Sequence, residues 1–240
     1  MNGVLSRRGL LASLAVLTGG VLVRELRAAA PFPKESGLSS EGLLAGRAGF
    51  QPRTVMPLPH EELPGFLSRA QLESHHAHYV RDVDRLKQTE QQLQAASPEA
   101  SSYGELRRAQ VAAANSALLH EFYFGGLAPR KVAPPNHVER NMAEHMGSWE
   151  SWTNDFTRCA LAAKAWAVLV YDPYDDRWHN ALLDSDHDGV WVGANPLVVC
   201  DVAEHAFAKD YSRREDYVAK FLEHIDWEEV SKRYRAVDRM

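Results

Sequence analysis

The stretch that decides the fold reads Asp201-Val202-Ala203-Glu204-His205-Ala206-Phe207. On a helical turn, residues four apart lie on one face, so we expect Asp201 and His205 to bind one ion together. A carboxylate beside an imidazole favours a transition metal over calcium or magnesium. The same spacing is typical of a solvated or capping pair, so it needs support from elsewhere in the chain.

That support comes from histidines far upstream. His120 lies in a predicted helix among apolar residues, where a histidine is either a satisfied core residue or a ligand. His75, His76 and His78 lie in the preceding predicted helix, and one of them should face its neighbour. Together these segments can supply three imidazoles and one carboxylate.

Two long helices precede the α/β part of the chain. Ser68 can cap a helix over residues 69–95, and a second helix is predicted over 103–124, ended by Gly125-Gly126. The short break at 97–102 predicts an antiparallel helical hairpin.

The pattern changes after residue 134. Helical stretches are followed by apolar runs with turn signals between them, which are typical of strands. We therefore predict an α+β fold, with a small three-stranded antiparallel sheet in its C-terminal part. The expected units are an extended arm (31–65), a helical hairpin domain (66–132) and a C-terminal α/β metal-binding domain (133–240), with strands near 166–171, 178–183 and 196–200.

Residues 1–30 have the pattern of a signal peptide. Arg7-Arg8 precede an apolar run over 10–23, and Ala28-Ala29-Ala30 offer small residues for cleavage. Paired arginines are typical of the twin-arginine class, so we expect a periplasmic or otherwise exported protein without a stable membrane span after signal removal. An uncleaved membrane anchor is the alternative.

Composition excludes some partners and leaves one cysteine question open. A formal net charge of -5 argues against a nucleic-acid partner. Cys159 and Cys200 form neither a CxxC pair nor a zinc-type spacing, so two small buried residues are the favoured interpretation and a disulfide stays open.

Several motifs together resemble the iron/manganese superoxide dismutase family. The family's C-terminal motif reads D-V-W-E-H-A-Y, its second-helix motif H-x-F-Y-W, and its run into the first ligand I-S-x-x-T-L-E-x-H. The matching residues are Asp201 to Phe207 with Asp210-Tyr211, Asp216-Tyr217 and Asp226-Trp227, His120 to Phe124, Leu67 to His75, Gly147-Ser148-Trp149 and Trp166. The resemblance covers about residues 57 to 235, nearly the whole chain after the predicted signal.

This resemblance implies a superoxide dismutase that holds one iron or manganese ion per subunit. The implied metal ligands are His75, His120, Asp201 and His205. Its implied catalytic neighbours are His187, which corresponds to a residue that orients bound solvent, the metal-site Trp166 and Tyr79. A loop histidine in an acidic run is the alternative for His187.

The resemblance also implies a homodimer, through Glu204 and His205. In the family, the residue that corresponds to Glu204 reaches the partner's ligand histidine; otherwise Glu204 is a surface carboxylate.

The chain departs from the family pattern around these ligands. Ala203 and Phe124 replace tryptophans, and Ala208 replaces an interface tyrosine. Without gaps, Val83 falls at the family's gateway tyrosine, whereas a four-residue gap would put Tyr79 there. The altered surroundings keep open a metal-binding protein with little dismutase activity. A two-His-one-carboxylate iron enzyme is a further alternative, although a third imidazole would close one of its coordination positions.

If export uses the twin-arginine route, it should depend on the paired arginines. Changing Arg7 and Arg8 together to lysine is expected to leave folded precursor in the cytoplasm, because this route reads the arginine pair. Fractionation of expressing cells, with detection of the mature chain, measures the effect. Unchanged delivery of the double variant to the periplasm would point to the general secretory route.

Overall fold

The computed structural model describes residues 54–185 and 188–238. The predicted signal peptide, most of the predicted arm, and His187 therefore lie outside the described residues. Within the described ranges, no helix combines the length and the apolar character that a membrane-spanning segment requires.

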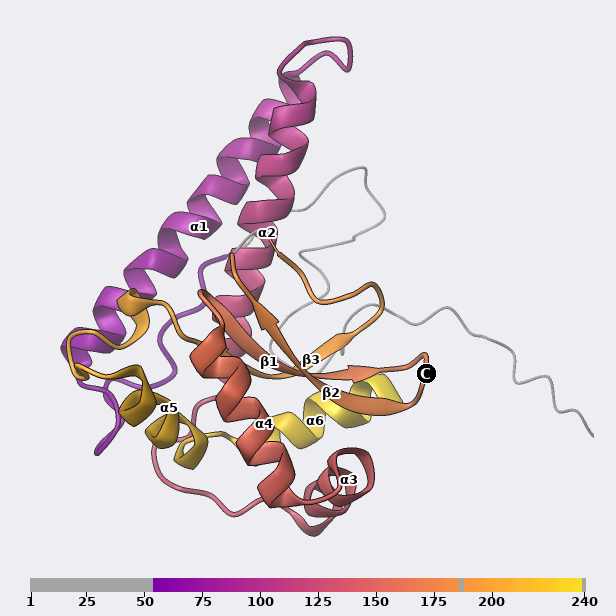
Figure 1. Ribbon diagram of the computed structural model, residues 1–240. Coiled ribbons are helices and arrows are strands. Elements are labelled where there is room, and N and C mark those ends of the chain that lie inside the picture. Colours follow the sequence, from indigo (N-terminus) through magenta and orange to yellow (C-terminus); the bar gives the residue numbers. More distant parts are fainter. Residues whose placement is uncertain (1–53, 186–187, 239–240) are drawn as a thin grey trace, which may run out of the picture. The chain divides into compact units, whose positions relative to one another are not determined.

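The predicted helical hairpin is present (Figure 1). Helix α1 (Arg69–Ala95) begins at Ser68, whose hydroxyl accepts a hydrogen bond from the backbone N–H of Gln71 at 3.2 Å. Helix α2 (Tyr103–Gly125) lies against it. The buried residues of α1 recur at helical spacing and include Leu72, His75, Tyr79, Val83 and Leu86.

The C-terminal part begins with two helices and a three-stranded antiparallel sheet. Helices α3 (Asn136–Met146) and α4 (Trp149–Ala162) lead into the sheet, whose strand order is β2-β1-β3. The central strand is apolar and almost wholly buried, because both of its edges are paired and its faces are covered. The strands are β1 (Trp166–Asp172), β2 (Arg177–Leu183) and β3 (Asn195–Asp201). These elements confirm the predicted α+β class.

Three short helical segments complete the described chain. A 3₁₀ turn, η2 (Glu204–Ala206), follows β3, and helices α5 (Arg214–Glu223) and α6 (Trp227–Asp238) follow it. From α6, the buried guanidinium of Arg233 donates hydrogen bonds to the carbonyl of Leu197 at 2.9 Å and that of Phe122 at 3.1 Å. This side chain therefore joins β3 to α2, two of the four elements that supply the candidate site.

The structure corrects the backbone expected around Asp201 and answers the question of a disulfide. Asp201 does not lie on a helix with His205: it is the last residue of β3, and His205 lies in η2. The local helical prediction was wrong because Asp201 completes a strand pairing with Trp166, and its carboxylate then accepts the N–H of Ala203 at 2.9 Å, which starts the turn. Cys159 and Cys200 are both free, and of the two only Cys200 is buried, whereas Cys159 is partly exposed.

Candidate metal centre

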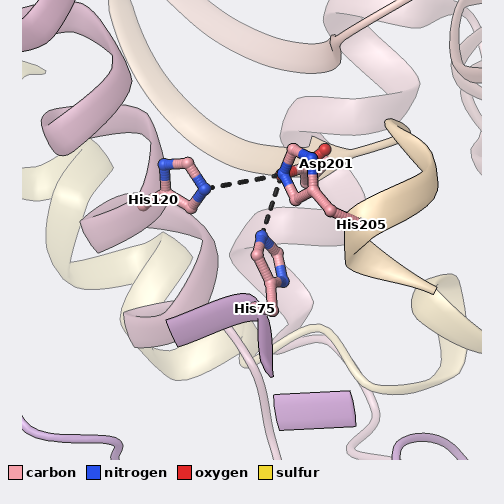
Figure 2. A group of neighbouring side chains, drawn as sticks. All are labelled: His75, His120, Asp201 and His205. Carbon is pink, nitrogen blue, oxygen red and sulfur yellow. Dashed lines mark hydrogen bonds and ion pairs between the residues drawn. The ribbon is translucent and has the colours of Figure 1, made fainter. Parts of the chain in front are cut away.

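Four side chains from both halves of the chain converge on one point (Figure 2). Helix α1 supplies His75, α2 supplies His120, the end of β3 supplies Asp201 and η2 supplies His205. Their candidate ligand atoms all lie within 4.8 Å of one another. The structure thus brings together the four residues that the sequence predicted as ligands.

The carboxylate of Asp201 is the centre of this group. Its Oδ2 lies 2.9 Å from Nε2 of His75, 3.0 Å from Nε2 of His205 and 3.7 Å from Nε2 of His120. Among the described residues, the buried Nε2 of His120 has no hydrogen-bond partner. An unpartnered nitrogen turned toward a carboxylate and two other imidazoles is what a metal ligand requires.

The ionisation states also fit a cation. Burial lowers the pKa of His75 to about 4, although the hydrogen bond to Asp201 opposes this. Burial raises the pKa of Asp201, but hydrogen bonds from His205 and His75 outweigh it and hold this pKa well below its ordinary range. A neutral His75 beside an ionised Asp201, with two further imidazoles at the same point, forms a donor set suited to iron, manganese or zinc.

The first turn of α1 fixes the segment that carries His205. The buried side-chain amide of Gln71 donates to the carbonyl of His205 at 2.7 Å and accepts the N–H of Lys209 at 2.9 Å. One turn earlier, the N–H of Ser68 donates to the carboxylate of Asp210 at 2.6 Å. These contacts hold the fourth candidate ligand against the hairpin.

Aromatic rings form the wall around the ligands. The ring of Trp166 meets that of His120 edge-on, with centroids 5.0 Å apart. Phe124 and Tyr123 lie 4.9 Å and 4.8 Å from the ring of His75. Phe124, at which the resemblance implies a tryptophan, therefore contacts a ligand ring.

Tyr79 occupies a buried polar position on the hairpin. Its hydroxyl donates to the Glu121 carboxylate at 2.9 Å and accepts the N–H of Met56 at 2.9 Å. Because α1 is continuous, Tyr79 lies one turn after His75 and Val83 lies two turns after it. The catalytic roles predicted for Tyr79, Trp166 and His187 stay predictions, the last because His187 lies outside the described residues.

Sequence reasoning missed three polar residues next to the ligands: Gln71, Asp82 and Ser116. Gln71 precedes His75 by four residues, and Ser116 precedes His120 by four, so both lie one turn from a ligand on the same face. Asp82 follows His75 by seven residues, which is two turns. Polar residues at helical spacing from a ligand are the signal that could have found them.

Three imidazoles and one carboxylate, held between a helical hairpin and a three-stranded sheet, define a metalloprotein. Residues 134–233 match the family profile described as iron/manganese superoxide dismutases, C-terminal domain. The manganese superoxide dismutase 2 of Haloferax volcanii is 32% identical over 186 residues, which cover 74% of this chain and 93% of the relative. The iron superoxide dismutase of Aquifex aeolicus is 31% identical over 194 residues, which cover 75% and 91%. The chain belongs to the iron/manganese superoxide dismutase family, and the resemblance inferred from its motifs is confirmed.

The shifted pKa of His75 predicts how acid affects the metal-free protein. Its imidazole is neutral in the folded chain down to about pH 4, whereas in the unfolded chain it takes up a proton near 6.5. The unfolded chain then binds more protons between these values, so the free energy of unfolding should fall as the pH drops below about 6.5. Asp201 acts in the same direction at lower pH still, because its folded pKa is also lowered.

Urea unfolding of chelator-treated protein at several pH values between about 4 and 6.5 measures how steeply the free energy of unfolding depends on pH. His75→Gln should flatten this dependence, while Gln91→Ala, at an exposed non-titrating position of α1 outside the site, should leave it as in the wild type. An equal slope in the wild type and His75→Gln would contradict this origin of the acid sensitivity.

Proposed function

We propose that this protein is a superoxide dismutase that uses one iron or manganese ion per subunit. The observation that carries the proposal is the convergence of the ligand atoms of His75, His120, Asp201 and His205. Membership of a family whose relatives are named as manganese or iron superoxide dismutases supports it.

A bound iron or manganese ion supplies a one-electron couple, with which one superoxide is oxidised to dioxygen and a second, taking up two protons, is reduced to hydrogen peroxide. The chain's own residues must hold the ion and keep the site largely dry. His75, His120 and Asp201 are nearly inaccessible to solvent, whereas the side chain of His205 is 24% exposed. Approach from outside is therefore most direct on the His205 side.

The assignments of the neighbouring residues follow from their positions. Trp166 and Phe124 pack on the ligand rings and exclude water. Tyr79 and Glu121 form a buried polar pair on the hairpin. Glu121 follows His120 in the sequence, and the ring of Tyr79 lies 6.2 Å from that of His120. We assign solvent orientation to His187 on the family resemblance, as part of the proposal.

Two further parts of the proposal concern assembly and location. We propose a homodimer in which Glu204 of one subunit reaches His205 of the other, since Glu204 is exposed beside the one partly exposed ligand. We also propose export, on the signal pattern of residues 1–30.

Elemental analysis and a dismutation assay per bound metal test the function. The mature chain should carry about one iron or manganese ion per subunit and dismutate superoxide, below the rate of a relative with Trp at the Ala203 and Phe124 positions. His120→Ala and Asp201→Ala should each lose metal and activity, because a vacated ligand position weakens the site directly. The control His137→Ala should retain both.

Stoichiometric metal in both ligand variants would contradict the site assignment. A metal-loaded wild type with no activity above that of the free metal ion would instead favour a metal-binding protein of this fold.

Sedimentation of the metal-loaded chain tests the dimer. We expect a dimer at micromolar concentration, weakened by Glu204→Lys because the charge reversal would set a cation against the partner's imidazole. Glu105→Lys, an exposed position in the first turn of α2, is the matched control. Monomer alone in the wild type would refute the proposed assembly.

A further inference from the structure

A second carboxylate approaches the metal site from the hairpin. Asp82 of α1 has a side chain that is only 14% exposed, and its Oδ2 lies 3.8 Å from Nδ1 of His120. On the solvent side, its Oδ1 lies 3.7 Å from Nη1 of Arg85, which is itself 64% exposed. Oδ2 of Asp82 therefore faces the ring of a candidate ligand, whereas Oδ1 faces a cation whose charge is screened by solvent.

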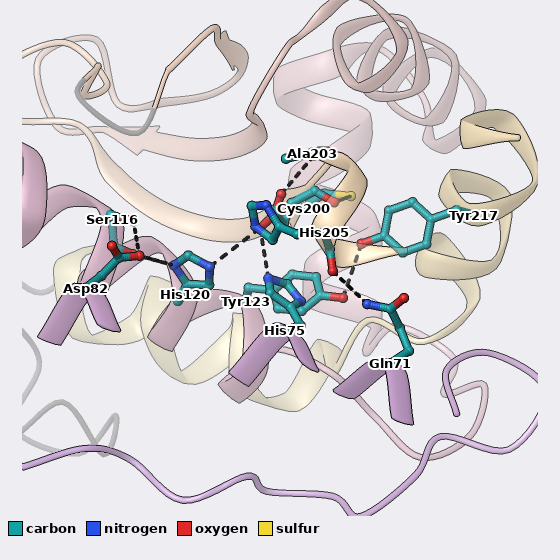
Figure 3. A network of polar contacts seen from close by, with 11 residues as sticks. Gln71, His75, Asp82, Ser116, His120, Tyr123, Cys200, Ala203, His205 and Tyr217 are labelled. Atoms are coloured by element: carbon teal, nitrogen blue, oxygen red, sulfur yellow. Dashed lines mark hydrogen bonds and ion pairs between the residues drawn. The ribbon is translucent and has the colours of Figure 1, made fainter. Parts of the chain in front are cut away.

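Ser116 links this carboxylate to the ligand (Figure 3). Its hydroxyl donates to Oδ2 of Asp82 at 2.7 Å, and its backbone carbonyl lies 2.8 Å from Nδ1 of His120. A carbonyl can only accept, so Nδ1 of His120 carries the proton and Nε2 presents its lone pair to the other ligands. One buried serine thus fixes both the position of the carboxylate and the tautomer of the ligand.

His75 has no equivalent support. Its Nδ1 is buried and has no hydrogen-bond partner among the described residues. Of these two hairpin ligands, His120 is therefore the one whose outer nitrogen lies near a negative charge. An acceptor and a carboxylate behind a ligating imidazole increase its basicity toward the metal.

We infer that Asp82 is a positioning residue that tunes the bound metal through His120, with Ser116 as its anchor. A negative charge held this close to a ligand in a poorly solvated site stabilises the oxidised, more positive metal ion over the reduced one. The carboxylate therefore lowers the reduction potential of the metal and strengthens its binding. This inference rests on the metal site of the proposed function.

A purely structural role makes a different prediction. The Asp82–Ser116 hydrogen bond also joins α1 to α2, so Asp82 could act only as a tie within the hairpin. Asp82→Asn separates the two roles, because the amide oxygen can still accept from Ser116 while the charge is lost. If Asp82 only joined the two helices, Asp82→Asn would leave the reduction potential of the metal unchanged.

The test is a mediated redox titration of the iron-loaded mature protein. The absorbance of the ferric form reports the fraction of oxidised iron at each potential. Asp82→Asn should raise the midpoint potential and weaken iron binding roughly tenfold, with little change in melting temperature. Asp84→Asn, on the same helix with its side chain 54% exposed, is the matched control and should match the wild type. Ser116→Ala should shift the potential upward by less, because the carboxylate stays but loses its anchor.

If the midpoint potentials of Asp82→Asn and Ser116→Ala both equal that of Asp84→Asn, this inference is overturned while the proposed function stands. If Asp82→Asn does not retain iron, the potential of Ser116→Ala decides: an upward shift supports the inference and an unchanged value overturns it. A wild type that takes up neither iron nor manganese would overturn the proposed function together with the inference.

Discussion

A buried carboxylate without compensation is among the most costly groups a protein can contain, and Asp201 is completely buried. Its two oxygens therefore dictate what surrounds it. Oδ1 accepts the N–H of Ala203, and Oδ2 faces three imidazoles, two of them at hydrogen-bond distance. A metal cation at the same point would complete the compensation, since hydrogen bonds alone do not cancel the charge. The hairpin, the end of the sheet and the 3₁₀ turn supply these groups at one point.

The scaffold brings these groups together through rigid elements. The pairing of Trp166 with Asp201 places the carboxylate at the end of β3 and the indole beside His120. The hairpin presents His75 and His120 from adjacent helices, and Gln71 binds the segment that carries His205. Three of the four ligands thus lie on an α-helix or a strand, and His205, in the short 3₁₀ turn, is held by α1. Such positioning favours precise ligand geometry over ligand mobility.

The elements were predictable where the pattern was local. Helical spacing defined α1 and α2, and apolar runs bounded by turn residues defined β1 and β2. The convergence of Asp201 and His205 was predicted, but with the wrong backbone, because strand pairing with β1 is a long-range contact. Gln71, Asp82 and Ser116 escaped prediction for a related reason. A polar residue on a helix is ordinarily solvated, and its role depends on which neighbour the tertiary structure supplies.

The two sides of the centre each supply two candidate ligands but differ in the other groups they place around them. The C-terminal half supplies the charged ligand and the partly exposed His205. The hairpin supplies two further carboxylates near His120: Glu121, buried and bonded to Tyr79, and Asp82, bonded to Ser116. The ligands are fixed by backbone positions in both halves, so substitutions around them need not disturb the donor set. The environment of His120 can therefore differ from the family pattern, as it does at Phe124, while the four ligands remain in place.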